Sequence, residues 1–106
     1  MRKLTPLEKV IDAIAAAARS EREFGVPGRV RFKFVRETPR AIILERRNGK
    51  TATIGKAKLA AALEGVRADH RLYIGGPGAL REVGITHINS PIYALLRLLP
   101  LNRLID

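Results

Sequence analysis

The hydrophobic positions of the first third of the chain change from a helical period to a strand period. One buried helix stripe is predicted by apolar residues three or four positions apart: Leu7, Val10, Ile11, Ile14, Ala15 and Ala18. A capping box, Thr5-Pro6-Leu7-Glu8, predicts the start of this helix, and Gly25 predicts its end. In RVRFKFVR, residues 29–36, charged and apolar residues then alternate, which predicts a strand with one apolar and one cationic face.

Two more strands are predicted to follow. Residues 41–47 form the second strand, and Asn48-Gly49 predicts a two-residue hairpin turn into a third strand at residues 50–54. This register places Arg47 directly opposite Lys50. Like charges in such a pair destabilise a hairpin unless an anion neutralises them.

The remaining pattern is mostly helical. A second helix is predicted over residues 56–64, closed by Gly65, and a fourth short strand over residues 71–74. A Ser-Pro pair begins a last helix over residues 90–99. The expected fold class is therefore α+β in one domain, residues 1–106: a small antiparallel sheet of three to four strands with an N-terminal helix and C-terminal helices.

The charge of the chain is large and unevenly placed. Twenty Lys and Arg against ten Asp and Glu give a net charge of +10. Residues 29–58 hold ten of the basic side chains, and only Glu37 and Glu45 are acidic there. A surplus of this density indicates contact with a polyanion, and nucleic acid is the favoured one. The alternative is a solvated sheet face of the kind found in heat-adapted proteins.

The candidate binding residues come from four segments. The open face of the first strand contributes Arg29, Arg31 and Lys33, the hairpin tip Arg46, Arg47 and Lys50, the start of the second helix Lys56 and Lys58, and the 71–74 segment Tyr73. The two lysines of the helix lie near backbone N–H groups that favour phosphate. Tyr73 is the expected platform for base stacking, which favours sequence-independent binding of single-stranded DNA and leaves RNA open.

No enzymatic chemistry is predicted. Cysteine is absent, which excludes disulfides and thiolate metal sites, and the two histidines, His70 and His87, have no metal-ligand spacing. We therefore expect no catalytic residue, no metal and no cofactor. Two alternatives stay open: a small basic ribonuclease or ribosome-directed toxin that uses a histidine, and a protein that coats double-stranded DNA or associates with the ribosome.

The end of the chain, IYALLRLLPLNRLID, is rich in leucine. It holds more apolar groups than one helix stripe buries, so self-association through this segment is expected, with burial in the monomer core as the alternative. No apolar run is long enough to span a bilayer, and no signal peptide precedes the first helix, so a cytoplasmic protein is expected, with nucleoid association open and no membrane partner. Glutamine is absent and the single methionine is the first residue, a composition typical of heat-adapted organisms.

The segments RVRFKFVR and ILERRNGKTATIGKAK carry a resemblance to a known family. Together with the size, charge and helix-then-sheet order of the chain, they resemble the small archaeal single-stranded DNA-binding proteins of the ThermoDBP-related group. The resemblance implies a basic antiparallel sheet combined with helices, sequence-independent binding of single-stranded DNA, and a multimeric assembly.

Overall fold

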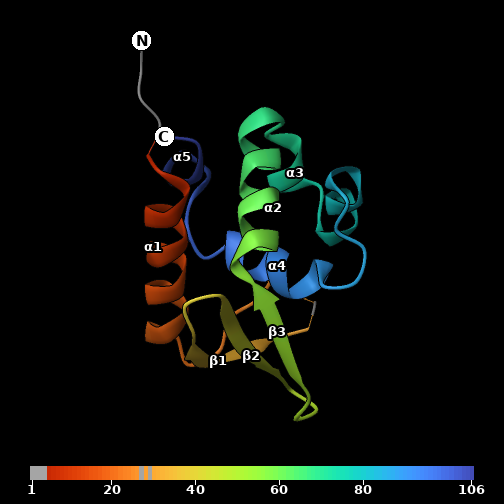
Figure 1. Ribbon diagram of the computed structural model, residues 1–106. Helices are drawn as coiled ribbons and strands as arrows, with labels where there is room; N and C mark the ends of the chain where they lie inside the picture. Colours follow the sequence, from red (N-terminus) through yellow and green to blue (C-terminus); the bar gives the residue numbers. More distant parts are fainter. Residues whose placement is uncertain (1–4, 27, 29) are drawn as a thin grey trace.

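The computed structural model describes residues 5–26, 28 and 30–106, so predictions that fall on residues 1–4, Pro27 or Arg29 lie outside the described residues. The elements are, in chain order, α1 (Leu7–Ser20), β1 (Phe32–Glu37), β2 (Ala41–Arg46), β3 (Thr51–Gly55), α2 (Lys56–Ala68), α3 (Arg71–Ile74), the 3₁₀ helix η1 (Pro77–Val83), α4 (Asn89–Leu96) and α5 (Leu101–Ile105). The predicted α+β class is confirmed: an N-terminal helix and a three-stranded antiparallel sheet precede the C-terminal helices (Figure 1).

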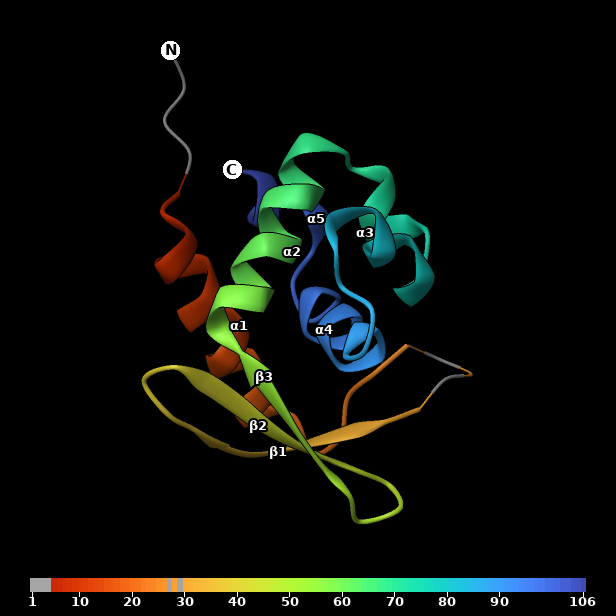
Figure 2. The ribbon, with the colours of Figure 1, turned by 45° about the vertical axis from the view of Figure 1, so that its right-hand side comes forward.

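The helices of the described chain all lie on one side of the sheet (Figures 1 and 2). Ile14 of α1, Leu63 of α2 and Ile92 of α4 are fully buried in one core cluster with Ile42 of β2. The strands are ordered β1-β2-β3, with β2 in the centre. The opposite face of the sheet carries no helix of the described chain.

β1 keeps the predicted alternation only in its first half. Phe32 is buried and Phe34 half-buried on the helix-facing side. The pairing with β2 then becomes irregular at Val35, which is 44% exposed. An extra residue of this kind is a β-bulge, which changes the face on which the following side chains lie. Glu37 consequently pairs with the buried Ile42 and lies on the helix-facing side. Strict alternation would have placed Arg36 on that side instead.

The hairpin between β2 and β3 differs from the predicted register by one residue. Glu45 pairs with Thr51, and the Arg46 N–H donates to the carbonyl of Lys50 at 2.8 Å. The N–H of Gly49 donates to the carbonyl of Arg46 at 2.9 Å, and Gly49 has a φ of +85°, whereas no described non-glycine residue has a positive φ. A type I turn followed by one left-handed glycine forms a three-residue loop, so an Asn-Gly pair suits this longer hairpin as well as the two-residue one.

α1 is shorter than predicted, since it ends at Ser20 and not at Gly25. The chain between them turns back to the sheet, where Phe24 and Phe32 exchange backbone hydrogen bonds of 2.9 and 2.8 Å. Gly25 has a φ of +150°, and a Cβ atom there would lie 2.9 Å from the carbonyl oxygen of Val30. The glycine therefore permits this close backbone approach and does not end the helix.

The predicted capping box does not form. Pro6 occupies the N-cap position of α1 without a side-chain cap, and the Thr5 hydroxyl donates to the Asp106 carbonyl at 2.9 Å. Arg67 of α2 donates to the carbonyls of Thr5 and Leu104 at 2.7 and 2.8 Å. These contacts join α1, α2 and α5. They use the hydroxyl and the carbonyl of Thr5, the residue that the sequence predicted to be the N-cap.

α2 continues through Gly65 to Ala68, so the predicted end at this glycine is wrong. Gly65 is buried, and a Cβ atom at this position would lie 2.7 Å from Cγ1 of Val83 and 3.0 Å from Cδ1 of Leu72. The glycine is thus a packing site where α3 and η1 approach α2 closely.

The predicted fourth strand at residues 71–74 is wrong, because this segment is the short helix α3. The carboxylate of Asp69 accepts the backbone N–H of Arg71 at 3.1 Å and so satisfies one free donor at the helix start. The side chain of Leu72 is buried against the core. This local hydrogen bond and tertiary packing outweigh the strand-like composition of Arg-Leu-Tyr-Ile.

The leucine-rich C-terminal segment packs within the single chain. Its buried side chains are Ile92, Tyr93, Ala94, Leu95, Leu96, Leu99 and Leu104, each at most 5% exposed. The large apolar residues that are exposed in the described part of the chain are Val30, Val35 and Ile74, all outside this segment. The burial agrees with the monomer-core alternative, and self-association stays a prediction. None of the described helices is both long and apolar enough to cross a bilayer.

Candidate nucleic-acid interface

The predicted binding cations separate into exposed groups and groups used by the fold. Lys33 on the open face of β1, Arg47 and Lys50 at the hairpin tip, and Lys58 in the first turn of α2 are exposed. Arg31, Arg46 and Lys56 are not, because each is held against the protein. Arg29 lies outside the described residues.

Arg31 secures the connection between α1 and β1. Its Nε lies 3.3 Å from a carboxylate oxygen of Glu23, and its Nη1 donates to the carbonyl of Gly25 at 3.1 Å. About a third of this side chain is exposed (36%). The charge of Arg31 is therefore partly neutralised within the chain, and its hydrogen bond to the Gly25 carbonyl fixes the position of its guanidinium group.

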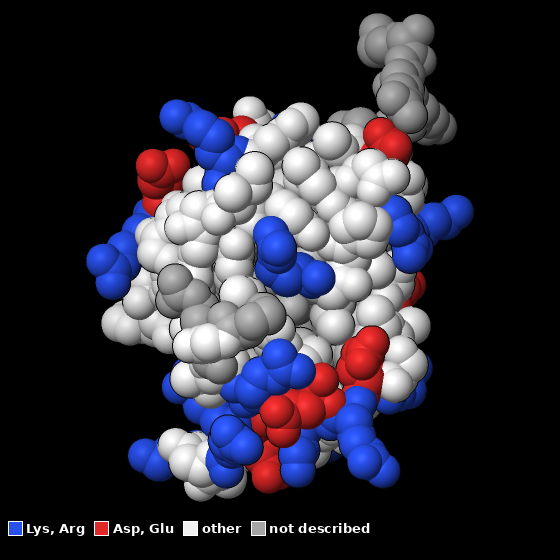
Figure 3. Space-filling model, turned by 180° about the vertical axis from the view of Figure 1, so that it is seen from behind, with Lys and Arg blue, Asp and Glu red and all other residues white. Residues whose placement is uncertain are grey.

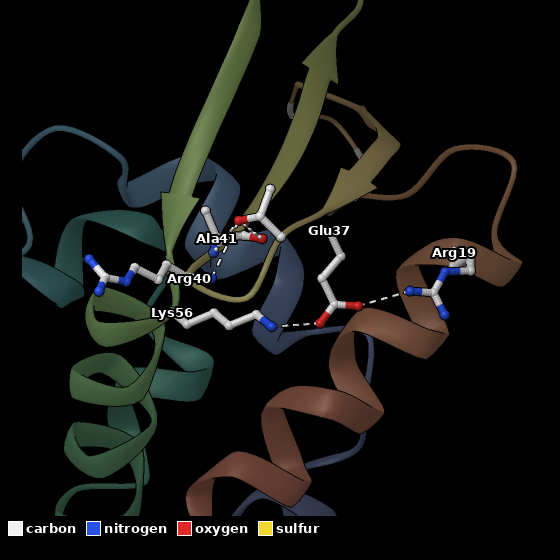
Figure 4. A network of polar contacts seen from close by, with 6 residues as sticks. Arg19, Glu37, Arg40, Ala41 and Lys56 are labelled. Atoms are coloured by element: carbon white, nitrogen blue, oxygen red, sulfur yellow. Dashed lines mark hydrogen bonds and ion pairs between the residues drawn. The ribbon is translucent and has the colours of Figure 1, made fainter.

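Lys56 is neutralised by Glu37, the residue that the β-bulge directs to the helix-facing side. Its Nζ lies 2.7 Å from one carboxylate oxygen of Glu37, and Nη2 of Arg19 in α1 lies 2.8 Å from the other (Figure 4). The hydrogen bond from Lys56, followed by the charges of Lys56 and Arg19, holds the pKa of Glu37 below its usual 4.5. Lys56 and Glu37 are each 21% exposed, so this ion pair joins the helices and the sheet and leaves little charge for a ligand.

Arg46 lies on the helix-facing side of the sheet, because it pairs with Phe32. Its guanidinium carbon is 5.9 Å from the centroid of the Phe32 ring, a cation–π contact. Arg46 therefore projects from the opposite side of the sheet to Lys33, which pairs with Glu45. The sheet face predicted to be cationic thus carries both Lys33 and the acidic Glu45, and Arg46 lies on the other face.

Tyr73 is not a free ring. Its hydroxyl donates to the carbonyl of Leu99 at 2.8 Å, and the guanidinium carbon of Arg97 lies 4.5 Å from its ring centroid. All five aromatic residues are described: Phe24, Phe32 and Tyr93 are buried, and Phe34 and Tyr73 are half-buried. The described surface therefore presents no exposed aromatic side chain for stacking a base.

Two further cations belong to the exposed set. Arg36 follows the bulge on β1, and Arg40 lies in the β1–β2 turn with its guanidinium directed away from Glu37 (Figure 4). We call Lys33, Arg36, Arg40, Arg47, Lys50 and Lys58 the exposed cations; in the part of the chain that the structure describes, none of them has an ion pair or hydrogen-bonded side chain. Arg36 and Arg40 are among the ten basic residues of the 29–58 segment. The alternation of charged and apolar residues gave no sign that these two stay unpaired in the described chain while Arg31 and Lys56 form ion pairs.

The exposed cations belong to the sheet end of the molecule. Seen from behind, basic and acidic side chains are interleaved at this end, whereas charged groups are more widely spaced over the helices (Figure 3). The acidic groups inside the 29–58 segment are Glu37, which is occupied by Lys56 and Arg19, and Glu45, which is half-buried opposite Lys33. The hairpin tip itself contains no acidic residue between Arg46 and Gly55.

One of the two histidines, His70, is remote from the exposed cations of the sheet. His70 lies in the turn after α2, while the sheet joins the start of α2, and a helix of 13 residues is about 20 Å long. His87 lies in the loop before α4. Among the described residues, no group of three His, Asp or Glu side chains could hold a metal ion.

Comparisons with protein-family models, curated proteins and solved structures find no match to this chain.

Proposed function

We propose that this protein binds nucleic acid independently of sequence, through the phosphate backbone and without catalysis. The observation that supports the proposal is the set of six exposed cations on the sheet, its turns and the first turn of α2, with no carboxylate paired to any of them in the described chain. In a chain of net charge +10, unpaired positive charges repel one another in the free protein. A polyanion removes this repulsion and releases its own counterions, which is the main source of sequence-independent affinity.

The contacts proposed here are made to phosphates more than to bases. Stacking on Tyr73 supported the preference for single strands, and this ring is covered by Arg97 and tied to Leu99. The resemblance to the ThermoDBP-related proteins stays a prediction, and so do binding of single-stranded DNA or RNA, assembly into oligomers and a cytoplasmic or nucleoid location. The exposed cations provide affinity for any of these polyanions.

The test is a titration of labelled oligonucleotides of two unrelated sequences, followed by fluorescence anisotropy over a range of salt. We expect equal affinities for the two sequences and a linear fall of log K with log salt, with a slope of up to about −5 if all six cations contact phosphates of duplex DNA. Absence of binding at low salt, or an affinity that does not change with salt, would contradict the proposal.

A further inference from the structure

The β2–β3 hairpin projects beyond the body of the molecule. In two views its turn extends away from the helices and from the rest of the sheet (Figures 1 and 2). Arg47, Asn48, Gly49, Lys50 and Thr51 are all exposed. The hairpin tip is therefore a narrow convex projection with solvent around it, and β1 flanks the hairpin only as far as Arg46.

The cations of the ribbon leave it in different directions. Arg47 lies in the turn, and Arg46 lies on the helix-facing side above Phe32. Lys33 extends from the opposite face of the neighbouring strand, where it pairs with Glu45. Exposed positive groups are thus present at the tip and, behind it, on the open face of the sheet, whereas Arg46 on the helix-facing side is half-buried against Phe32.

We propose that this hairpin enters the major groove of double-stranded DNA; the proposal rests on the proposed function and names its substrate class. The major groove of B-DNA is about 12 Å wide and admits a two-stranded β-ribbon. Two paired strands lie about 4.8 Å apart, so the ribbon and its side chains fill a space of that width. A ribbon in the groove has a row of phosphates on each side, which suits the side chains of Arg47 and Lys50 at the tip, exposed and unpaired in the described chain.

The same features disfavour the other nucleic acids. Binding of single strands combines a basic groove with exposed aromatic rings. The described surface has no exposed aromatic ring, and Arg47 and Lys50 lie at a convex hairpin tip. Double-stranded RNA has a deep and narrow major groove that a ribbon does not enter.

Base reading by the tip is limited by its own hydrogen bonds. The Oδ1 atom of Asn48 accepts the backbone N–H of Lys50 at 3.0 Å, so the amide is engaged inside the turn. The flexible side chains of Arg47 and Lys50 have no such partner in the described chain. Entry into the groove is therefore compatible with sequence-independent binding.

The experiment compares one DNA duplex, each of its single strands and an RNA duplex of the same sequence, at equal salt. We expect the DNA duplex to bind about tenfold more tightly than the others. The double substitution Arg47→Ala and Lys50→Ala should weaken duplex binding by about tenfold or more and reduce the magnitude of the salt slope by about 2. The control, Lys9→Ala with Arg81→Ala, removes the same two types of exposed cation from helical elements and should have a smaller effect.

A second measurement uses the unaltered protein. Bound protein should protect guanine N7 atoms, which face the major groove, from dimethyl sulfate. Equal binding of single strands and duplex, equal effects of the two double variants, or protection confined to minor-groove atoms would each overturn the groove proposal and leave the proposed function intact. Failure to bind any of the nucleic acids would overturn both.

Discussion

The ammonium group of Lys56 lies 2.7 Å from the carboxylate of Glu37. The sequence predicted that this lysine binds nucleic acid, but in the structure it forms an ion pair within the protein. The same carboxylate binds Arg19, so one acidic residue at the end of β1 connects α1, the sheet and the start of α2 (Figure 4). The bulge at Val35 makes this possible, because it places Glu37 on the helix-facing side. The fold thereby neutralises part of the cationic segment and leaves the remainder exposed.

The Glu37 ion pairs should make stability depend on acid pH. The pKa of Glu37 in the folded protein is below its usual 4.5, so the stabilisation is present above that pH and is lost as the pH falls through the folded pKa. We expect Glu37→Gln to lower the free energy of unfolding by about 1–2 kcal/mol at neutral pH and by much less near pH 3. Urea denaturation at the two pH values measures this. Glu45→Gln is the control, because Glu45 forms no ion pair in the described chain. Equal losses for Glu37→Gln at both pH values would contradict the assignment.

Gly65→Ala should destabilise the protein although alanine is the better helix former by about 1 kcal/mol. The added Cβ atom would lie 2.7 Å from Cγ1 of Val83, so the side chain of Val83 must shift. Overpacking of this kind costs about 1–3 kcal/mol. Combining Gly65→Ala with Val83→Ala should recover more stability than the two single changes predict by addition. A stabilised Gly65→Ala variant in thermal unfolding would show that the contact relaxes without cost.

Arg31 and Arg36 should separate stability from binding. Arg31→Ala removes the contacts with Glu23 and Gly25 and should lower the free energy of unfolding by about 1–2 kcal/mol. Arg36→Ala should leave stability unchanged to within about 0.5 kcal/mol and weaken nucleic-acid binding severalfold. Chemical denaturation and anisotropy on both variants decide the matter. If Arg31→Ala weakened nucleic-acid binding and left stability unchanged, Arg31 would belong to the binding surface.

Tyr73→Phe tests whether this ring belongs to the fold. The variant removes the hydroxyl that donates to Leu99 and should cost about 1 kcal/mol of stability while leaving affinity for single-stranded DNA unchanged. Tyr73→Ala should destabilise further, since Arg97 also loses the ring beneath it. A loss of single-strand affinity in the Phe variant, with stability retained, would favour the stacking role.

Leu95→Asn tests the leucine-rich segment. Leu95 is fully buried in the core of the single chain, so a polar group there should cost about 3 kcal/mol or more and lead to general unfolding. Circular dichroism and light scattering on the same sample measure fold and mass together. A folded variant of reduced mass would instead identify an interface between copies.

Much of the fold followed from local periodicity, and the errors occurred where distant residues intervene. The stripe from Val10 to Ala18 is buried as expected, because the helical period itself specifies one buried face. Residues 71–74 had the composition of a strand but form a helix, since Asp69 accepts the backbone N–H of Arg71 and Leu72 packs into the core. Gly65 resembled a helix end because the tight contact with Val83 arises from a segment 18 positions further along the chain.

The sequence by itself determined the class of the fold and the surplus of positive charge, since both depend on which residues are present and on their spacing. Only the tertiary structure decided which cations stay exposed. Arg31 and Lys56 each find a carboxylate at a distant position, and a single bulge in β1 selects the face on which Glu37 lies. Charge is a property of composition, but neutralisation requires two side chains to meet in space, and that depends on the packing of α1, α2 and the sheet.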